Sequence, residues 1–125
     1  MGNHDKKPKM IYCFDIDGTI CTNTEGDYEK AKPFLDVVAE VNRLYYTGNR
    51  ILLNTARGGT TGTDWTDVTK HQLKKWGVHY HELIMTKPTA DVFIDDRAIN
   101  AVAWRTSKFK QNLDTTKKLW VGNKG

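Results

Sequence analysis

Asp15 and Asp17 are two carboxylates separated by one residue, a pair whose type and spacing could do chemistry. They directly follow residues 10–14, whose apolar and β-favouring side chains predict a strand buried on both faces. Successive side chains of an extended chain alternate, so the two carboxylates should lie on the same side. Gly18 comes next and lets the backbone leave the strand in a conformation that other residues resist. Open α/β sheets bind ligands at the carboxyl ends of their strands, so a site is expected here.

Polar or charged residues also follow the other three predicted strands, at residues 50–53, 82–86 and 92–94. These residues are Thr55, Lys87 and the pair Asp95 and Asp96. Parallel strands would bring all of them to one edge of the sheet. Carboxylates around a gap suit a hard cation, and Mg²⁺ takes one or two carboxylates together with waters and a substrate phosphate. Hydroxyl and ammonium groups suit phosphate oxygens, and a carboxylate can attack phosphorus and carry it.

Amphipathic segments separate the predicted strands. Residues 34–45 and 65–76 carry apolar side chains at helical spacing, and Gly48 and Gly77 are placed to end the two helices. A third helix is expected from Arg97. Strands that alternate with helices indicate parallel pairing and right-handed crossovers. We therefore predict an α/β fold, with a Rossmann-like parallel sheet and helices on both faces.

The composition favours one domain spanning residues 1–125. No apolar run approaches the roughly 20 residues that cross a bilayer, so no membrane partner is expected, and residues 1–9 lack the apolar stretch of a signal peptide. There are two cysteines, which indicate neither a disulfide framework nor a Cys-rich metal site. A reduced, cytoplasmic location is therefore expected.

The net charge of +4 is concentrated near the end of the sequence. Residues 105–125 hold six basic residues and one acidic residue. We expect a solvated basic tail here, and a nucleic-acid partner is the less favoured interpretation.

The residues at the strand ends resemble the motifs of the haloacid dehalogenase (HAD) superfamily of phosphohydrolases. Residues 15–19, Asp-Ile-Asp-Gly-Thr, are similar to its first motif. Thr55, Lys87 and the acidic pair at 95–96 match the second, third and fourth motifs, in the family order. The resemblance covers residues 10–104.

The resemblance implies a role for each matching residue. Asp15 would be the nucleophile and a ligand of Mg²⁺. Asp17 would protonate the leaving oxygen and then take a proton from the hydrolytic water, while its backbone carbonyl binds the metal. Thr55 and Lys87 would hold the transferring phosphoryl group, and Lys87 would also neutralise Asp15.

Asp95 and Asp96 would complete the magnesium site. The resemblance implies that Asp95 is the other metal carboxylate. Asp96 would either bind the metal too or hold a metal ligand in place, and we favour the second role. Ile94 precedes them where the family usually has Gly, which leaves metal binding compatible with the sequence.

Two features narrow the class within the family. An acid at position 17 favours a phosphatase or mutase, because the ATPases carry Thr there and the dehalogenases lack the second acid. The connections after Thr19 and Thr55 are too short for a separate cap domain. The chain therefore resembles capless members, particularly small phosphatases of surface-glycan and sugar-phosphate biosynthesis. The runs at residues 55–58 and 61–65 favour that subgroup, and a sugar phosphate is the expected substrate.

Arg57 and Trp65 flank the Gly-rich turn after Thr55, and we expect both to contact substrate at the rim of the site. Without a cap, a neighbouring subunit would have to exclude water from a small substrate. A homo-oligomer with its interface near residues 21–32 is therefore expected.

Three other functions stay open. A signalling receiver domain also uses acids, a Thr and a Lys, but its acceptor Asp would end a mid-chain strand, where this chain has Asn54 and Thr55. A HAD fold can serve as a non-catalytic binding module. The third is a nucleotidase or polynucleotide 3′-phosphatase served by the basic tail.

Overall fold

A computed structural model describes residues 7–109 of the chain, apart from the side chain of Phe109. The chain divides into two compact units, the first ending at Val92 and the second beginning at Phe93.

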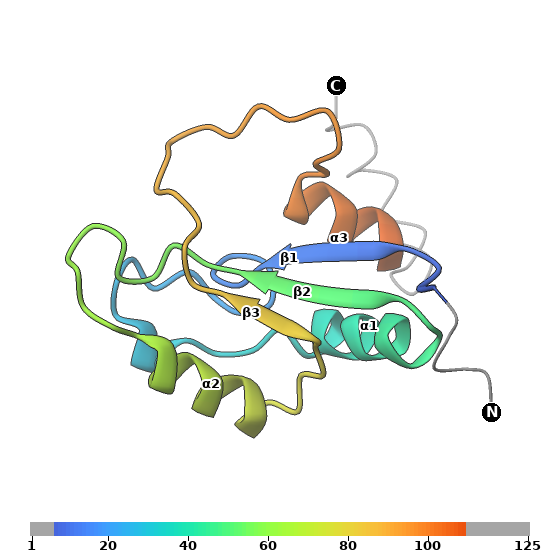
Figure 1. Cartoon of the computed structure of the whole chain (residues 1–125), viewed down its shortest axis with the longest axis horizontal. Coiled ribbons are helices and arrows are strands. Elements are labelled where there is room, and N and C mark those ends of the chain that lie inside the picture. Colours follow the sequence, from blue (N-terminus) through green and yellow to red (C-terminus); the bar gives the residue numbers. More distant parts are fainter. Residues whose placement is uncertain (1–6, 110–125) are drawn as a thin grey trace. The chain divides into compact units, whose positions relative to one another are not determined.

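The first unit contains a sheet of three parallel strands in the order β1-β2-β3 (Figure 1). The strands are β1 (Ile11–Asp15), β2 (Arg50–Asn54) and β3 (Glu82–Ile84). In the ladder, Asp15 is the partner of Asn54, the last residue of the central strand. The strand expected at residues 82–86 ends earlier, at Ile84.

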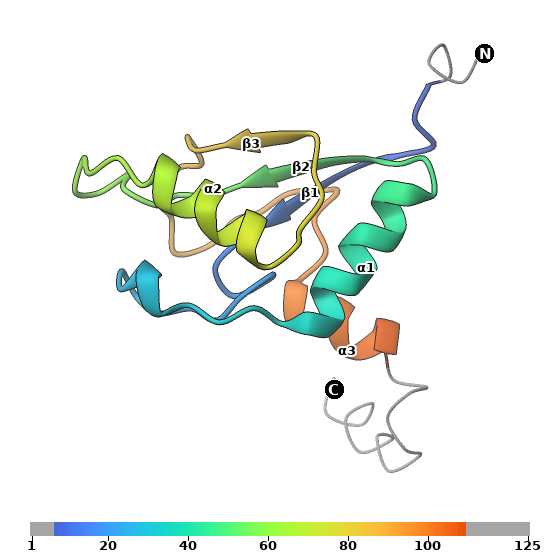
Figure 2. The same ribbon diagram turned by 90° about the horizontal axis from the view of Figure 1, so that it is seen from below.

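Two helices connect the strands: α1 (Leu35–Tyr46) joins β1 to β2, and α2 (Thr66–Lys75) joins β2 to β3. A short 3₁₀ helix, η2 (Tyr28–Lys30), lies in the stretch before α1. Figures 1 and 2 show α1 and α2 on the same side of the sheet, as right-handed crossovers between strands in this order require. The Rossmann-like α/β fold expected from the sequence is confirmed. Within this unit both helices cover one face of the sheet, and helices on both faces stay a prediction.

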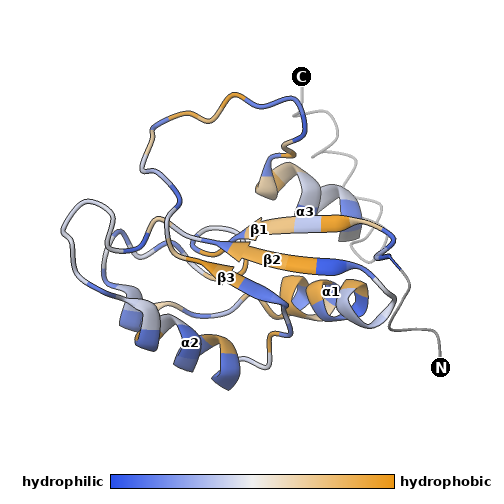
Figure 3. Ribbon diagram, viewed as in Figure 1, coloured by the Kyte–Doolittle hydropathy of each residue, from blue (hydrophilic) through white to orange (hydrophobic). Residues whose placement is uncertain are grey.

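The core lies between the sheet and these helices. Phe14, Ile51 and Leu53 occupy the helix-facing side of β1 and β2 and are buried. Figure 3 shows the apolar strands and the apolar face of α1 in orange, and a largely hydrophilic α2. Val37 and Val41 of α1 are fully buried.

The expectation that the first strand is buried on both faces is wrong. Ile11 is 61% exposed and Cys13 is exposed, because both lie on the face of β1 opposite to α1 and α2. β1 is also an edge strand of the sheet within residues 7–109. A short apolar run does not distinguish a strand covered on one face from one covered on both.

The second unit contains one helix in the described part of the chain, α3 (Ala101–Phe109). It begins later than expected because Asn100 acts as its cap: the Asn100 side chain accepts a hydrogen bond from the backbone N–H of Ala103 at 3.0 Å. The strand predicted at residues 92–94 does not form, and Ile94 is 95% exposed. Three apolar residues make a strand only when a neighbouring strand pairs with them.

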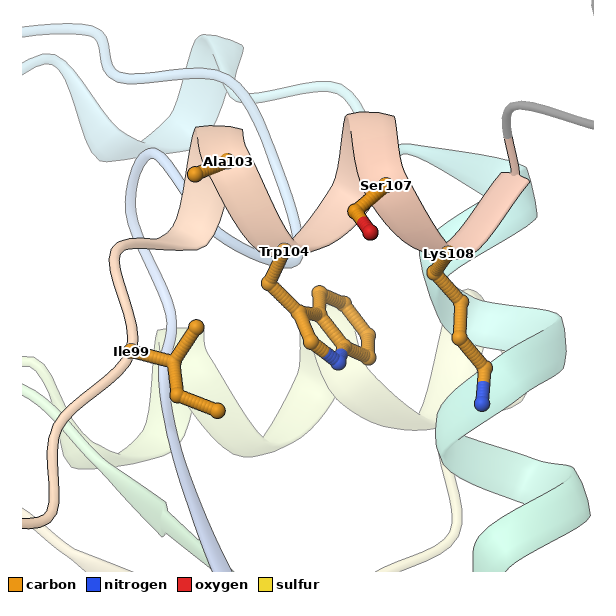
Figure 4. Close-up of a pocket in the computed structure, with 5 residues that line it drawn as sticks. All are labelled: Ile99, Ala103, Trp104, Ser107 and Lys108. Atoms are coloured by element: carbon orange, nitrogen blue, oxygen red, sulfur yellow. The ribbon is translucent and has the colours of Figure 1, made fainter. Parts of the chain in front are cut away.

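A shallow pocket of about 400 Å³ lies along α3 (Figure 4). Its lining residues are Ile99, Ala103, Trp104, Ser107 and Lys108. None of them is among the residues that the sequence predicts to take part in chemistry.

The expected basic tail begins inside α3, whose residues 105–109 are helical, and residues 110–125 lie outside the described residues. Within the described part of the chain, no helix has the length and apolar character that a membrane span requires.

Candidate active site

A tight turn carries the two acids of the first motif. Gly18 has φ +85°, a left-handed backbone that favours glycine. The carbonyl of Ile16 accepts hydrogen bonds from the N–H groups of Thr19, Ile20 and Cys21. The N–H of Gly18 bonds to the carbonyl of Cys21 at 2.8 Å. The turn therefore fixes the backbone of the acidic motif directly after β1.

Asp15 lies beside Lys87. The ammonium Nζ of Lys87 is 3.3 Å from Oδ1 of Asp15. The backbone N–H of Lys87 donates to the carbonyl of Thr55 at 3.2 Å. The ends of β1 and β2 and the segment after β3 therefore bring together Asp15, Thr55 and Lys87, three of the residues that the sequence nominated.

The electrostatics of Asp15 are a balance of two opposing effects. Burial raises the pKa of its carboxyl, and the charge and hydrogen bond of Lys87 oppose that rise without cancelling it. The net pKa is raised. A carboxylate of raised basicity that stays partly accessible, 36% in this case, has the character of a nucleophile.

Thr55 is 1% exposed and is held from both sides. Its N–H donates to the carbonyl of Ile84 at 2.9 Å, and its hydroxyl oxygen accepts from the N–H of Arg57 at 3.1 Å. The hydroxyl thus stabilises the turn that follows β2.

Asp17 forms a two-point ion pair with Arg57. The Nε of Arg57 lies 2.9 Å from Oδ2 of Asp17, and NH2 lies 2.8 Å from Oδ1. The side chain of Arg57 is 0% exposed and that of Asp17 is 17% exposed. Both carboxylate oxygens are therefore engaged in a largely water-free setting.

Arg57 does not lie at an exposed rim, so the substrate contact expected for it disagrees with its placement. Its NH1 donates to Thr69 Oγ1 at 3.0 Å and to Gln72 Oε1 at 2.7 Å. Burial alone would lower the pKa of Arg57, but the hydrogen bonds and charge of Asp17 outweigh it and the pKa is raised. The side chain carries a permanent charge that the protein itself neutralises.

Trp65 is half-buried and packs against the turn after β2. Its ring meets that of Tyr28 edge-on, with centroids 5.0 Å apart. A Cβ added to Gly58 would lie 3.1 Å from the Trp65 ring. Trp65 therefore supports this turn, and the substrate contact expected for it stays a prediction.

Asp95 and Asp96 belong to the second unit and are exposed. Oδ1 of Asp95 accepts a hydrogen bond from the N–H of Arg97 at 3.0 Å. That bond, with a further contribution from Asp96, lowers the pKa of Asp95. Among residues 7–109, no three His, Cys, Asp or Glu side chains gather closely enough to hold a metal ion.

The donors of the first unit nevertheless fit Mg²⁺. Mg²⁺ needs one or two protein carboxylates and completes its shell with waters and substrate phosphate. Asp15 supplies such a carboxylate at a partly accessible position.

The sequence did not reveal the partners of Asp17 and Arg57. The thiol of Cys21 lies 3.6 Å from Oδ1 of Asp17, and burial, followed by the charge of Asp17, raises its pKa to about 12. Cys21 is therefore a neutral donor. Thr69 and Gln72 lie one helical turn apart on the buried face of α2, and two polar residues on a core-facing stripe indicate only that some polar group faces them.

Comparison with known proteins supports the fold. No family model and no curated protein matches the chain. A crystal structure of an MCSG target from Vibrio cholerae superimposes with a TM-score of 0.68 at 25% identity, covering 82% of this chain and 94% of that one.

Two structures of the Pnkp1/Rnl/Hen1 complex, one described as an RNA repair complex, are also similar. Their TM-scores are 0.53 and 0.52 at 16% identity, over 88% and 87% of this chain. The chain spans only 36% and 33% of those chains. What this chain shares with these structures is a Rossmann-like α/β fold.

Proposed function

We propose that the chain is a magnesium-dependent phosphomonoester hydrolase that works through an aspartyl-phosphate on Asp15. The observation that carries the proposal is the pairing of Asp15 with Lys87 at 3.3 Å, next to Thr55, at the carboxyl ends of parallel strands. In this pair, Lys87 is the group that would bind the phosphate anion, and Asp15 is the proposed nucleophile. The resemblance of the motif residues to the HAD superfamily supports the same chemistry.

The proposed reaction has two halves. In the first, a carboxylate oxygen of Asp15 bonds to phosphorus and the bond from phosphorus to the leaving oxygen breaks, while Asp17 gives that oxygen a proton. In the second, Asp17 takes a proton from water as the water oxygen bonds to phosphorus. The bond to Asp15 then breaks, and inorganic phosphate leaves. Lys87 neutralises charge that builds on the phosphoryl oxygens.

The proposed magnesium ligands are Asp15, the backbone carbonyl of Asp17 and Asp95, with Asp96 supporting the site. Bound Mg²⁺ would neutralise phosphate charge and fix the orientation of the phosphoryl group. Asp95 and Asp96 enter this set through the resemblance alone.

The proposed substrate is a sugar phosphate, with Trp65 as a contact and a neighbouring copy of the chain as the cover. The cover rests on the lack of a long insertion after the first two motifs. The sugar phosphate rests on the resemblance, and the Trp65 contact rests on the place of Trp65 beside the turn after Thr55. The stretch between Cys21 and α1 holds only the three-residue helix η2.

A second candidate is a phosphatase that acts on nucleic-acid ends. Its support is the fold shared with chains of a complex named for RNA repair, together with the six basic residues after position 104. A 3′-phosphorylated oligonucleotide places its phosphate at the end of a polymer, which an open site could accept without a cap.

One experiment tests the chemistry and separates the substrates. Phosphate release would be measured with Mg²⁺ on hexose phosphates, nucleotides and 3′-phosphorylated oligonucleotides, for the native chain and for Asp15→Asn. Asp67→Asn, an exposed acid in the first turn of α2, is the control. We expect loss of turnover in Asp15→Asn alone, and a phosphorylated Asp15 in the native chain after acid quenching. Full turnover in a folded Asp15→Asn protein would disprove the proposal.

A further inference from the structure

We propose that Arg57 is a positioning residue, which fixes the carboxylate of Asp17 and ties it to α2 and to the stretch at residues 22–32. The inference rests on the proposed function, in which Asp17 moves the protons. Arg57 is assigned no contact with substrate or with the reacting atoms.

The hydrogen bonds of Arg57 account for every N–H group it has. A guanidinium carries five N–H donors in a rigid plane. Nε and NH2 donate to Asp17, NH1 donates to Thr69 and Gln72, and the remaining NH2 hydrogen faces the Sγ of Cys21 at 3.8 Å. No donor remains for a substrate phosphate, and the side chain is 0% exposed.

The fork geometry of the pair determines the orientation of Asp17. Two parallel N–H···O bonds hold a carboxylate in the plane of the guanidinium, whereas a single bond would let it rotate. The remaining lone pairs of Asp17 then point in fixed directions. A proton-transfer group must lie within hydrogen-bond distance of the atom it serves, so the rate depends on this orientation.

Arg57 is itself fixed by contacts with α2 and with Tyr28. Thr69 and Gln72 fix NH1 from α2. The guanidinium carbon lies over the ring of Tyr28, 4.7 Å from its centre, in a cation–π contact. Gln72 also donates to the backbone carbonyl of Tyr28 at 2.6 Å. One buried cation thus joins the acidic turn, α2 and the stretch before α1.

The decisive variants are Arg57→Lys and Thr69→Val. Arg57→Lys keeps the positive charge but loses the fork, because an ammonium group has no second nitrogen to pair with the carboxylate. Thr69→Val is isosteric and removes only a support of NH1, so it tests the idea where Arg57→Lys fails to fold. Arg43→Lys is the matched control, because Arg43 forms the same two-point pair with Glu40, at 2.9 and 2.7 Å, on α1.

The measurement is steady-state turnover of a hexose phosphate, beside single-turnover phosphorylation of the enzyme by an aryl phosphate. A sugar leaving group needs a proton, whereas an aryl leaving group needs little help. We expect Arg57→Lys to lower kcat on the hexose phosphate by about 10²-fold with little change in KM. Thr69→Val should lower kcat by a smaller factor, and phosphorylation by the aryl ester should be spared in both. Arg43→Lys should match the native chain.

Two outcomes would overturn the proposal. A rise in KM at unchanged kcat in Arg57→Lys would mean that Arg57 binds substrate. An equal loss with sugar and aryl phosphates would mean that it merely holds the fold. Asp15→Asn runs in parallel: turnover that survives in Asp15→Asn would refute the proposed function, whatever Arg57→Lys does.

A spectroscopic readout needs no activity at all. In ¹⁵N NMR spectra, the Nε–H of Arg57 should exchange with water far more slowly than the Nε–H of Arg43, whose side chain is 53% exposed. Asp17→Asn should speed that exchange by at least tenfold while Arg43 stays unchanged. Equal exchange of the two groups in the native chain would show that the buried pair is absent in solution.

Discussion

The ammonium of Lys87 lies 3.3 Å from the carboxylate of Asp15, although Asp15 ends the first strand and Lys87 follows the last. The pair is incompletely buried, with Lys87 19% and Asp15 36% exposed. Burial raises the pKa of Asp15, and Lys87 holds that rise in check. The ionisation of the proposed nucleophile therefore depends on a residue from a distant part of the sequence.

Removing Lys87 should move the acid limb of the pH–rate profile. Lys87 lowers the pKa of Asp15 against the effect of burial, so Lys87→Met should raise that pKa further. Asp15 must be ionised to attack phosphorus, so the acid limb should shift to higher pH. The profile of kcat/KM from pH 4 to 8 checks this. Lys70→Met, an exposed lysine on α2, is the control, and an unshifted limb in Lys87→Met would contradict the pairing.

Neutralising the two acids of the first motif should change stability in opposite directions. The raised pKa of Asp15 means that the folded chain binds its proton more tightly than the unfolded chain, so ionisation of Asp15 destabilises the fold. The free energy of unfolding of Asp15→Asn should therefore rise above that of the native chain as pH increases from about 4 through the raised pKa of Asp15. Below about pH 4 the ionisation of Asp15 should cause no difference between the two chains.

Asp17→Asn should instead lose about 3–5 kcal/mol, because it leaves the buried charge of Arg57 without its counter-charge. Urea unfolding at pH 4 and pH 7 measures both effects. Equal changes in the two variants would show that the environments of the two acids do not differ as described.

The role proposed for Asp17 predicts a split between substrates. Asp17→Asn should lower hydrolysis of a hexose phosphate by about 10²–10⁴-fold. Phosphorylation of Asp15 by an aryl phosphate should change much less, because an aryl leaving group departs without a proton. Rapid-quench measurement separates the two steps. Equal losses in both would assign Asp17 a purely structural role.

Gly58 should be irreplaceable, whereas Gly62 should not. Both have left-handed backbones, with φ +82° and +78°. A Cβ on Gly58 would overlap the carbonyl oxygen of Thr63, while one on Gly62 would meet nothing within 4 Å. Gly62→Ala should cost about 1–2 kcal/mol from its backbone alone. Gly58→Ala should cost more and also lower kcat, because the turn that carries Arg57 must move. Denaturant midpoints that agree for the two variants would refute the predicted clash.

The magnesium requirement should distinguish Asp95 from Asp96. Asp95 is the proposed ligand, so Asp95→Asn should raise the Mg²⁺ concentration for half-maximal activity by about 100-fold. Asp96→Asn should raise that concentration by about 10-fold. Removal of Mg²⁺ with a chelator should abolish turnover, and adding it back should restore it. Asp91→Asn, exposed and nearby in sequence, is the control. The reverse order of the two effects would exchange the two roles.

Local patterns predicted most of the first unit. The apolar spacing of residues 34–45 gave a helix that is found at Leu35–Tyr46, and Gly48 and Gly77 follow the helices with φ +101° and +74°. These features depend on neighbours in sequence. Residues 92–94 failed as a strand because pairing depends on a partner far along the chain, which three apolar residues do not specify.

The residues of the candidate site also fall into those that the sequence predicted correctly and those that it did not. The convergence of Asp15, Thr55 and Lys87 followed from parallel strands, whose carboxyl ends share an edge. Arg57 was expected at the rim because it flanks the Gly-rich turn after Thr55, where a cation could bind a substrate phosphate. Its partner Asp17 lies 40 residues away, and no local pattern indicates that an arginine will be buried by residues from three segments.

The stretch at residues 22–32 is fastened at its base and near its middle. Thr22 and Lys32 exchange two hydrogen bonds, at 2.9 and 3.0 Å, and Gln72 holds the carbonyl of Tyr28. Such a segment forms a fixed wall and cannot swing as a lid. In many enzymes the opening of a lid sets the pace of turnover. In a hydrolase built on this site, the opening of residues 22–32 would therefore not limit the rate of turnover.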